Sequence, residues 1–161
     1  MIFYCPNCWA HVRKDEKVCH ECETDIEPLD HRDYFGKLVN ALNHPERTTR
    51  IRAAYIMGTL GYHRAVKPLV KVLENPKGLE DIFFIEAVAI SLGKVDGEEA
   101  IPILIRLMEH PSFLVRKAAL HSLSNFRNEE AIKAVKRALE DTSPNVQELA
   151  RKILKLNEER I

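Results

Sequence analysis

The feature that most constrains the fold of this chain is an internal repeat that starts after residue 30. Three segments, which begin at Thr49, Phe84 and Val115, align without gaps, and a fourth copy begins at Val146. Their starting points are 35, 31 and 31 residues apart. Periods of this size are typical of stacked helical arrays, in which each repeat packs only against its neighbours.

A second repeated element lies between these segments, at residues 65–73, 100–108 and 131–139. Its apolar residues recur at positions i, i+3, i+4 and i+7, which predicts an amphipathic helix. Proline is tolerated at the start of a helix but not in its interior, so prolines separate the two helices of each repeat. The predicted turns are His44-Pro45, Asn75-Pro76, His110-Pro111 and Ser143-Pro144. The four extra residues of the second repeat fall at 76–81, as a loop or an extra turn.

The aligned segments resemble the HEAT-like repeats of the bilin-lyase type. The likeness rests on a helix B that begins near V-R-x-A-A and ends near A-L-G-x-L-G, followed by a helix A of the type R-A-V-x-x-L. It implies an all-α fold, an α-solenoid of about four helix pairs over residues 31–161. Arg50 and Arg116 fall on the family's arginine position, and we expect structural roles for both. Ile85 and Gln147 replace that arginine in the other two copies.

All four cysteines lie near the start of the chain, in two C-x-x-C pairs. Cys5 and Cys8 form the first pair, and Cys19 and Cys22 form the second. Two such pairs can supply four thiolates to a tetrahedral Zn²⁺. The alternatives are a disulfide framework, four free thiols, or a redox motif, which would need a βαβ pattern that the sequence lacks. An iron ion in place of zinc, or His11 or His20 in place of one thiolate, also stays open.

This segment resembles the short zinc-ribbon family, in which each C-x-x-C pair forms a knuckle on a small β-hairpin. The resemblance implies a zinc ribbon over residues 1–28 and one structural Zn²⁺ held by Cys5, Cys8, Cys19 and Cys22. Such knuckles commonly have glycine after the second cysteine, where φ is positive. Here Trp9 and Glu23 take those places, and we expect slightly distorted knuckles.

The ribbon segment is acidic, and it contains the only tryptophan. Residues 1–30 have three basic and seven acidic side chains, which makes the segment a poor reader of phosphates. Trp9 is too large for so small a module to bury. We expect it either to pack on the neighbouring domain or to anchor a partner, because tryptophan is enriched in binding hot spots.

The HEAT-like resemblance implies that the second helices, the B helices, line the concave face. The column of side chains exposed there is predicted to be Tyr55, Ile90, His121 and Lys152, flanked by Glu86 and Lys117. Apolar side chains at the centre and mixed charges at the rim favour a protein-binding surface. The alternative is an ordinary solvated helix face. We therefore predict an adaptor or scaffold that binds a protein partner through this face, with the zinc ribbon and Trp9 as a second contact.

The second functional hypothesis is a nucleic-acid-associated factor that works on RNA, the ribosome or the transcription machinery. It rests on the zinc ribbon and on a basic outer side of the A helices, where an ordinary solvated face is again the simpler interpretation. The basic residues there are Lys67, Lys71, Arg106, Lys133, Lys136 and Arg137.

Motifs for catalysis and for membrane insertion are missing from the sequence. It contains no phosphate-binding glycine loop, zinc-protease motif or nucleophile elbow. The best acid/base pair that could be built is Glu86 with His121. His44 and His110 occupy equivalent turns, which favours a role in turn formation. We therefore predict a protein that is not an enzyme, has no small-molecule substrate, does not enter membranes and is cytoplasmic.

Overall fold

The computed structural model describes residues 3–27, 33–74, 81–95 and 97–158. The chain divides into two compact units, Met1–Ala53 and Ala54–Ile161. The predicted domain boundary at residues 28–31 lies outside the described residues, as do the Asn75-Pro76 turn and all of the 76–81 insertion except Asp81. The boundary therefore stays a prediction.

The first unit begins with two short hairpins. Strand β1 (Phe3–Tyr4) pairs with the antiparallel strand β2 (His11–Val12), and an isolated bridge joins Val18 to Asp25 in the second hairpin. Helix α2 (Tyr34–Ala41) follows. Strands of two residues cannot form a core, so the hairpins depend on another source of stability.

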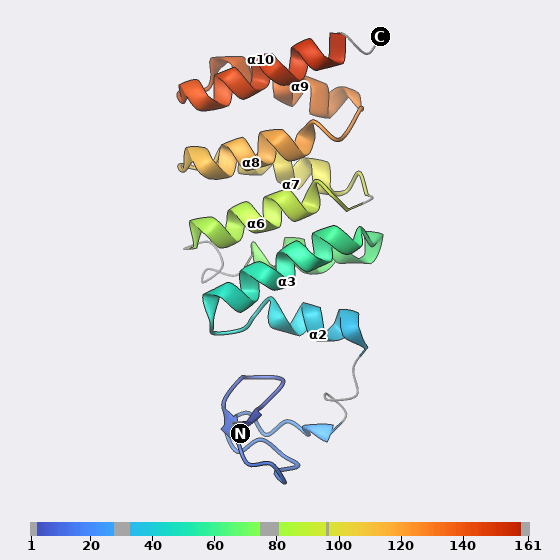
Figure 1. Ribbon diagram of the computed structural model, residues 1–161, viewed down its shortest axis with the longest axis vertical. Helices are drawn as coiled ribbons and strands as arrows, with labels where there is room; N and C mark the ends of the chain where they lie inside the picture. Colours follow the sequence, from blue (N-terminus) through green and yellow to red (C-terminus); the bar gives the residue numbers. More distant parts are fainter. Residues whose placement is uncertain (1–2, 28–32, 75–80, 96, 159–161) are drawn as a thin grey trace. The chain divides into compact units, whose positions relative to one another are not determined.

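The second unit consists of paired helices. The B helices are the C-terminal part of α3 (Arg47–Leu60), α6 (Ile82–Leu92), α8 (Phe113–Leu123) and α10 (Pro144–Glu158). The A helices are α4 (Val66–Val72), which follows a 3₁₀ turn at His63–Ala65, α7 (Ala100–Leu107) and α9 (Glu129–Arg137), which continues into a 3₁₀ turn at Ala138–Glu140. Within this unit α6, α8 and α10 lie one above another as a layer, with α7 and α9 behind them (Figure 1).

Side-chain caps and proline define where several helices begin. The carboxylate of Asp81 accepts the backbone N–H of Phe84 at 3.2 Å, and the amide oxygen of Asn128 accepts the N–H of Ala131 at 2.9 Å. These bonds satisfy donors that have no partner inside the helix. Pro144 is the first residue of α10, as proline at a helix start predicts.

The core of the second unit lies between the A and B layers. Its largest fully buried side chains include Leu69, Phe84, Leu104, Leu120 and Leu123. Each comes from the apolar side of one helix. Every sequence repeat therefore contributes its own set of buried side chains to the core.

The B helices also contact each other through small residues. The hydroxyl of Ser91 donates to the carbonyl oxygen of Ala54 at 2.8 Å, and that of Ser122 donates to the carbonyl oxygen of Ala89 at 2.8 Å. A Cβ atom added to Gly58 would lie 2.7 Å from the Cα of Ser91. Neighbouring B helices therefore approach to backbone contact where glycine faces serine, and we call the two contacts, Gly58 with Ser91 and Gly93 with Ser122, the glycine-serine seams.

An ion pair joins the third and fourth repeats. The guanidinium of Arg116 donates to both carboxylate oxygens of Asp141 at 2.8 Å, and the two side chains are only 11% and 9% exposed. The same guanidinium donates to the carbonyl oxygens of His110 and Pro111 at 2.9 Å. The arginine position of the repeat thus has a structural role at Arg116. Arg50, at the equivalent place in α3, is half-buried.

These observations confirm the predicted fold class, an α-solenoid of helix pairs with a small N-terminal cysteine module. Within the second unit the pairs are α4 with α6, α7 with α8 and α9 with α10. None of the helices in the described ranges has both the length and the apolar character that crossing a bilayer requires.

Candidate metal centre and helix surfaces

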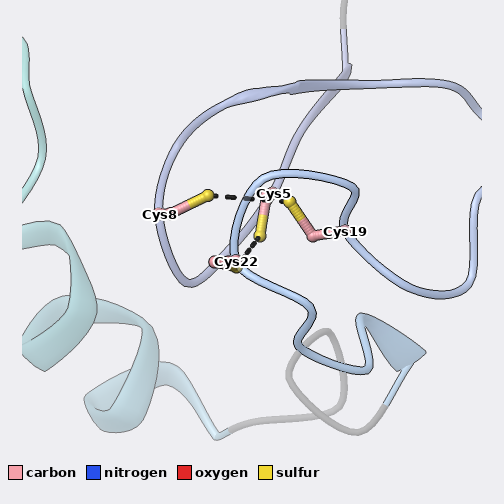
Figure 2. A group of neighbouring side chains, drawn as sticks. All are labelled: Cys5, Cys8, Cys19 and Cys22. Atoms are coloured by element: carbon pink, nitrogen blue, oxygen red, sulfur yellow. Dashed lines mark hydrogen bonds between the residues drawn. The ribbon is translucent and has the colours of Figure 1, made fainter.

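The four cysteines meet at one point between the two hairpins (Figure 2). One sulfur atom from each of Cys5, Cys8, Cys19 and Cys22 lies within 4.8 Å of all the others. The Sγ atoms of Cys5 and Cys22 are 3.7 Å apart, and those of Cys8 and Cys19 are 3.6 Å apart. A disulfide would need about 2.05 Å. Four sulfurs about 2.3 Å from a tetrahedral ion would be separated by about 3.8 Å. The cysteines can therefore hold a metal ion.

Each cysteine pair forms the same turn. The N–H of Trp9 donates to the carbonyl oxygen of Cys5 at 2.9 Å, and the N–H of Glu23 donates to that of Cys19 at 2.8 Å. Trp9 has φ of 65° and Glu23 has φ of 55°. The knuckle backbone is thus kept even though glycine is missing, and both residues adopt a left-handed conformation that costs about 1 to 2 kcal/mol for a side chain with a Cβ.

The electrostatics of the cluster also favour a cation. The Thr24 hydroxyl and the Asn7 amide lower the pKa of the Cys22 thiol to about 6. A backbone contact with Ala10 favours the thiolate of Cys8, but burial and the three neighbouring sulfurs outweigh it and raise the Cys8 pKa to about 12. A thiolate formed at one cysteine therefore disfavours ionisation of the next cysteine, and a bound cation would offset this repulsion between negative charges.

Trp9 lies against the helical part of the first unit. The centroids of the Trp9 and His44 rings are 4.2 Å apart in an edge-to-face arrangement, which is a favourable geometry for aromatic pairs. The side chain of Asn40, in α2, donates to the carbonyl oxygen of Pro6 in the first knuckle. The structure therefore gives Trp9 a packing role, the first of the two alternatives considered for it, and it leaves the residue half-buried.

The predicted column of the B-helix face occupies one equivalent position on α3, α6, α8 and α10. Tyr55 is 37% exposed, His121 and Lys152 are exposed, and Ile90 is half-buried. The flanking Glu86 is half-buried and Lys117 is exposed. We define these six residues as the B-face column.

Neighbouring helices influence one another along this column. Burial, and then the charge of Glu86 on the next helix, raise the pKa of Tyr55. Lys152 pairs with Glu148 at 2.6 Å, and this pairing, with smaller contributions from Arg151 and from Lys117 on α8, lowers the pKa of Glu148. In the described part of the chain Glu86 and His121, the candidate acid/base pair, do not form a hydrogen bond with each other.

The two turn histidines do the same thing in equivalent turns. Nδ1 of His44 accepts the backbone N–H of Glu46 at 2.9 Å, and Nδ1 of His110 accepts that of Ser112 at 3.0 Å. Both rings thus satisfy a backbone donor just before a B helix. This is the turn role that their equivalent placement indicates.

Sequence reasoning missed two clefts on the A-helix side. One, of about 610 Å³, lies between α4 and α7, and the other, of about 640 Å³, lies between α7 and α9. Each is formed by residues of two consecutive A helices. A search of one helix at a time cannot find such a cleft, but the repeat alignment could have indicated that the two are equivalent.

Comparison with known proteins identifies the repeats. A family model described as HEAT repeats matches residues 35–110 and 81–155. The chain belongs to the HEAT-repeat family. This confirms the resemblance drawn from the aligned helices, and no curated protein gives a significant match to the HEAT-repeat chain.

A similar solved structure is that of human deoxyhypusine hydroxylase in complex with glycerol. It matches with a TM-score of 0.65 and 22% identity, over 80% of this HEAT-repeat chain and 45% of the hydroxylase chain. The chain thus spans less than half the length of that enzyme. At this identity the likeness shows the fold alone.

This neighbour corrects one prediction. The repeat class and the missing motifs predict that the chain is not an enzyme, and that prediction is wrong because HEAT repeats form the fold of a hydroxylase. Side chains on successive helices can meet in space while lying about one repeat apart in sequence, so a search for short motifs does not exclude catalysis.

Proposed function

We propose that this HEAT-repeat chain is an adaptor that binds a protein partner along its B helices. The observation that carries the proposal is the B-face column, which presents one side chain from each of α3, α6, α8 and α10 in a single row. A HEAT-repeat solenoid is compatible with a scaffold role. Repeat proteins use such extended surfaces for binding.

The chemistry of the column suits a protein partner. Tyr55 offers a partly exposed aromatic ring, and Ile90 and His121 lie beside it on the next two helices. Tyrosine is enriched in hot spots, which lie near the centre of an interface with charged groups around them. A rim that carries both negative and positive charges would come from Glu86, Lys117 and Lys152. Such a rim favours a partner with the complementary charge pattern.

The first prediction concerns this column. In the double variant Tyr55→Ala/His121→Ala we expect partner affinity to fall about 30-fold or more, the loss of about 2 kcal/mol that hot-spot truncations reach. The partner is first isolated with the tagged full-length chain from nuclease-treated native lysate and identified by mass spectrometry. Its affinity is then measured by calorimetry, with circular dichroism to show unchanged helicity.

The matched control removes the same two residue types elsewhere. Tyr62 is 47% exposed, and His63 follows it in the 3₁₀ turn before α4. The variant Tyr62→Ala/His63→Ala should keep full affinity. Equal losses in both double variants, or none in the first, would contradict the B-face assignment.

We further propose that the ion held by the four cysteines is a structural Zn²⁺. Support comes from the four-sulfur donor set and from sulfur separations that fit a tetrahedral zinc site. With all four positions filled by protein, zinc supplies no open site for chemistry. Its contribution would be folding free energy, since the short hairpins have little core of their own.

The second prediction tests the metal. The purified full-length chain should retain about one zinc ion per chain through gel filtration, and Cys8→Ser or Cys22→Ser should lose most of it, because a hydroxyl is a poor replacement for a thiolate ligand. Elemental analysis measures the content. Chelation should unfold residues 3–27 and spare most of the helical signal.

His20→Ala is the control for this experiment. The His20 ring is exposed and its Nδ1 contacts Glu16 at 2.7 Å, so the variant should keep its zinc. Loss of metal on this change would show that a histidine replaces a thiolate. Iron in place of zinc would reject the metal assignment, while full zinc content in both serine variants would reject the ligand set.

The ribbon is proposed as a second contact for the partner. Tyr4 and Val18 are 50% and 54% exposed on the hairpins, and Trp9 contributes by holding the first knuckle against His44. If the ribbon takes part, chelation weakens partner binding in a chain whose helices stay folded.

A further inference from the structure

The two clefts between A helices are equivalent by the repeat. Lys67 and Val70 of α4 line the first cleft, and the repeat alignment places Pro102 and Ile105 of α7 at the same positions in the second. Glu99, the residue just before α7, lines the first cleft and corresponds to Glu130 of α9 in the second. One surface feature is thus repeated along the A-helix side, with α7 between the two copies.

Each cleft has an aliphatic floor and a basic rim. Val70 and Ile103 are half-buried in the first cleft, and Ile105 is half-buried in the second. Lys67 and Lys71 are exposed beside the first cleft, and the cations of the second are Lys133, Lys136 and Arg137. The acids of the rims are Glu74, Glu99 and Glu130.

Most of these cations have no acidic partner. Lys133 pairs with Glu129 at 2.6 Å, and Glu99 contacts Nε2 of His63 at 3.2 Å. Across the described ranges no carboxylate forms an ion pair with Lys67, Lys71, Lys136 or Arg137. These four groups could accept an external carboxylate without breaking an internal pair.

We propose that the A-helix clefts bind an acidic, extended segment of a partner protein that carries aliphatic side chains. The aliphatic floors would hold those side chains, and the unpaired cations would hold the acidic residues between them. A nucleic-acid strand fits less well. Bases bind single-strand sites by stacking on aromatic rings. Among the described residues that line the two clefts, the one aromatic ring is the imidazole of His63, and its Nε2 already contacts Glu99 at 3.2 Å.

The repeat sets the spacing of the aliphatic residues. Packed helices lie about 8 to 10 Å apart, so neighbouring clefts should be separated by about that distance. An extended chain advances about 3.3 Å per residue. Aliphatic side chains three residues apart would therefore enter consecutive clefts, with acidic residues at the two positions between.

The test uses the full-length chain and synthetic probes. One fluorescent peptide repeats the pattern leucine, acidic, acidic, and a second peptide has serine in place of every leucine. We expect saturable binding of the leucine peptide only, and at least a tenfold loss of affinity for Lys67→Glu/Lys136→Glu. The control Lys94→Glu/Arg127→Glu makes the same charge change at two exposed residues that line neither cleft, and it should bind normally. Circular dichroism checks the fold of both.

Three outcomes would overturn the proposal. If the serine peptide binds as well as the leucine peptide, charge alone explains binding and the aliphatic floors have no role. If a single-stranded uridine oligonucleotide of matched charge binds better than the peptides, the surface is a nucleic-acid site. The third outcome is that no probe binds. This site is separate from the B-face column, so loss of partner binding in Tyr55→Ala/His121→Ala does not bear on it.

Discussion

Replacing Arg116 with alanine should destabilise the protein by about 3 to 5 kcal/mol, the cost of leaving one member of a buried ion pair without its partner. The Asp141 carboxylate is 9% exposed and would keep its charge in a poorly hydrated place. The carbonyl oxygens of His110 and Pro111 would lose a donor at the same time. Chemical denaturation of the full-length chain, followed by the helical circular dichroism signal, measures the loss.

Two further variants identify the origin of this loss. Arg116→Lys keeps the charge but not the planar fork that bonds both carboxylate oxygens, so part of the loss should remain. Arg151 is exposed and donates to Gln147 in the same helix at 3.0 Å. Arg151→Ala should therefore change stability by no more than about 0.5 kcal/mol. A loss at Arg116 as small as that would show that the ion pair does not hold the two repeats together.

The same pair gives a pH dependence with a definite sign. Hydrogen bonding to Arg116 lowers the pKa of Asp141 below its ordinary 3.8, against an opposing effect of burial. The folded chain therefore binds this proton less readily than the unfolded chain, and the pair stabilises the fold above about pH 4. That stability is lost as the pH falls through the folded pKa. The difference in unfolding free energy between the natural chain and Arg116→Ala should narrow at acid pH.

Replacing Gly93 with alanine should cost about 2 to 3 kcal/mol, near the upper end of the usual effect of overpacking a core. The new Cβ would lie 2.4 Å from Cβ, 2.5 Å from Oγ and 2.7 Å from Cα of Ser122. The last of these is backbone, so α6 and α8 must separate and the bond from Ser122 to Ala89 must stretch. Gly93 has φ of −72°, a backbone conformation that alanine adopts without strain. The steric clash with Ser122 therefore makes the substitution destabilising.

Gly97→Ala is the matched control for this seam. Its Cβ would meet only side-chain atoms: Oε2 of the exposed Glu99 at 2.9 Å, Cγ2 of Val66 at 3.2 Å and Cδ2 of His63 at 3.4 Å. No backbone has to move, unlike at Gly93. We expect a change of less than about 1 kcal/mol. Adding Ser122→Gly to Gly93→Ala should restore part of the stability, because two of the three clashing atoms are gone. A Gly93→Ala protein as stable as the control would mean that the helices are not in backbone contact.

Much of this fold follows from the sequence because its signals are local and repeated. The apolar period places each helix, and α6, α7 and α8 fall within a few residues of the aligned segments. The two cysteine pairs likewise predict the metal centre, since four sulfurs at that spacing have few other uses. In both cases one short segment contains the whole pattern.

What sequence reasoning missed depends on distance across the fold. Ser91 and Ser122 occupy equivalent repeat positions, but the period does not reveal that each hydroxyl bonds the preceding B helix. The positive φ of Trp9 is also not predicted by the sequence. A residue with a Cβ atom disfavours positive φ, so the sequence predicts a distorted knuckle instead. The hydrogen bond to Cys5 and the contact with His44 keep it in that conformation.

The glycine-serine seams limit how such a gene could lengthen or shorten by whole repeats. Deleting the α4 to α6 pair would bring Gly58 opposite Ser122, which reproduces a seam that already exists. Deleting the α7 to α8 pair would instead bring Gly93 opposite Ile153, a branched side chain larger than the serine that Gly93 faces now. The repeats are therefore not interchangeable modules, and loss of the first pair should be tolerated better than loss of the second.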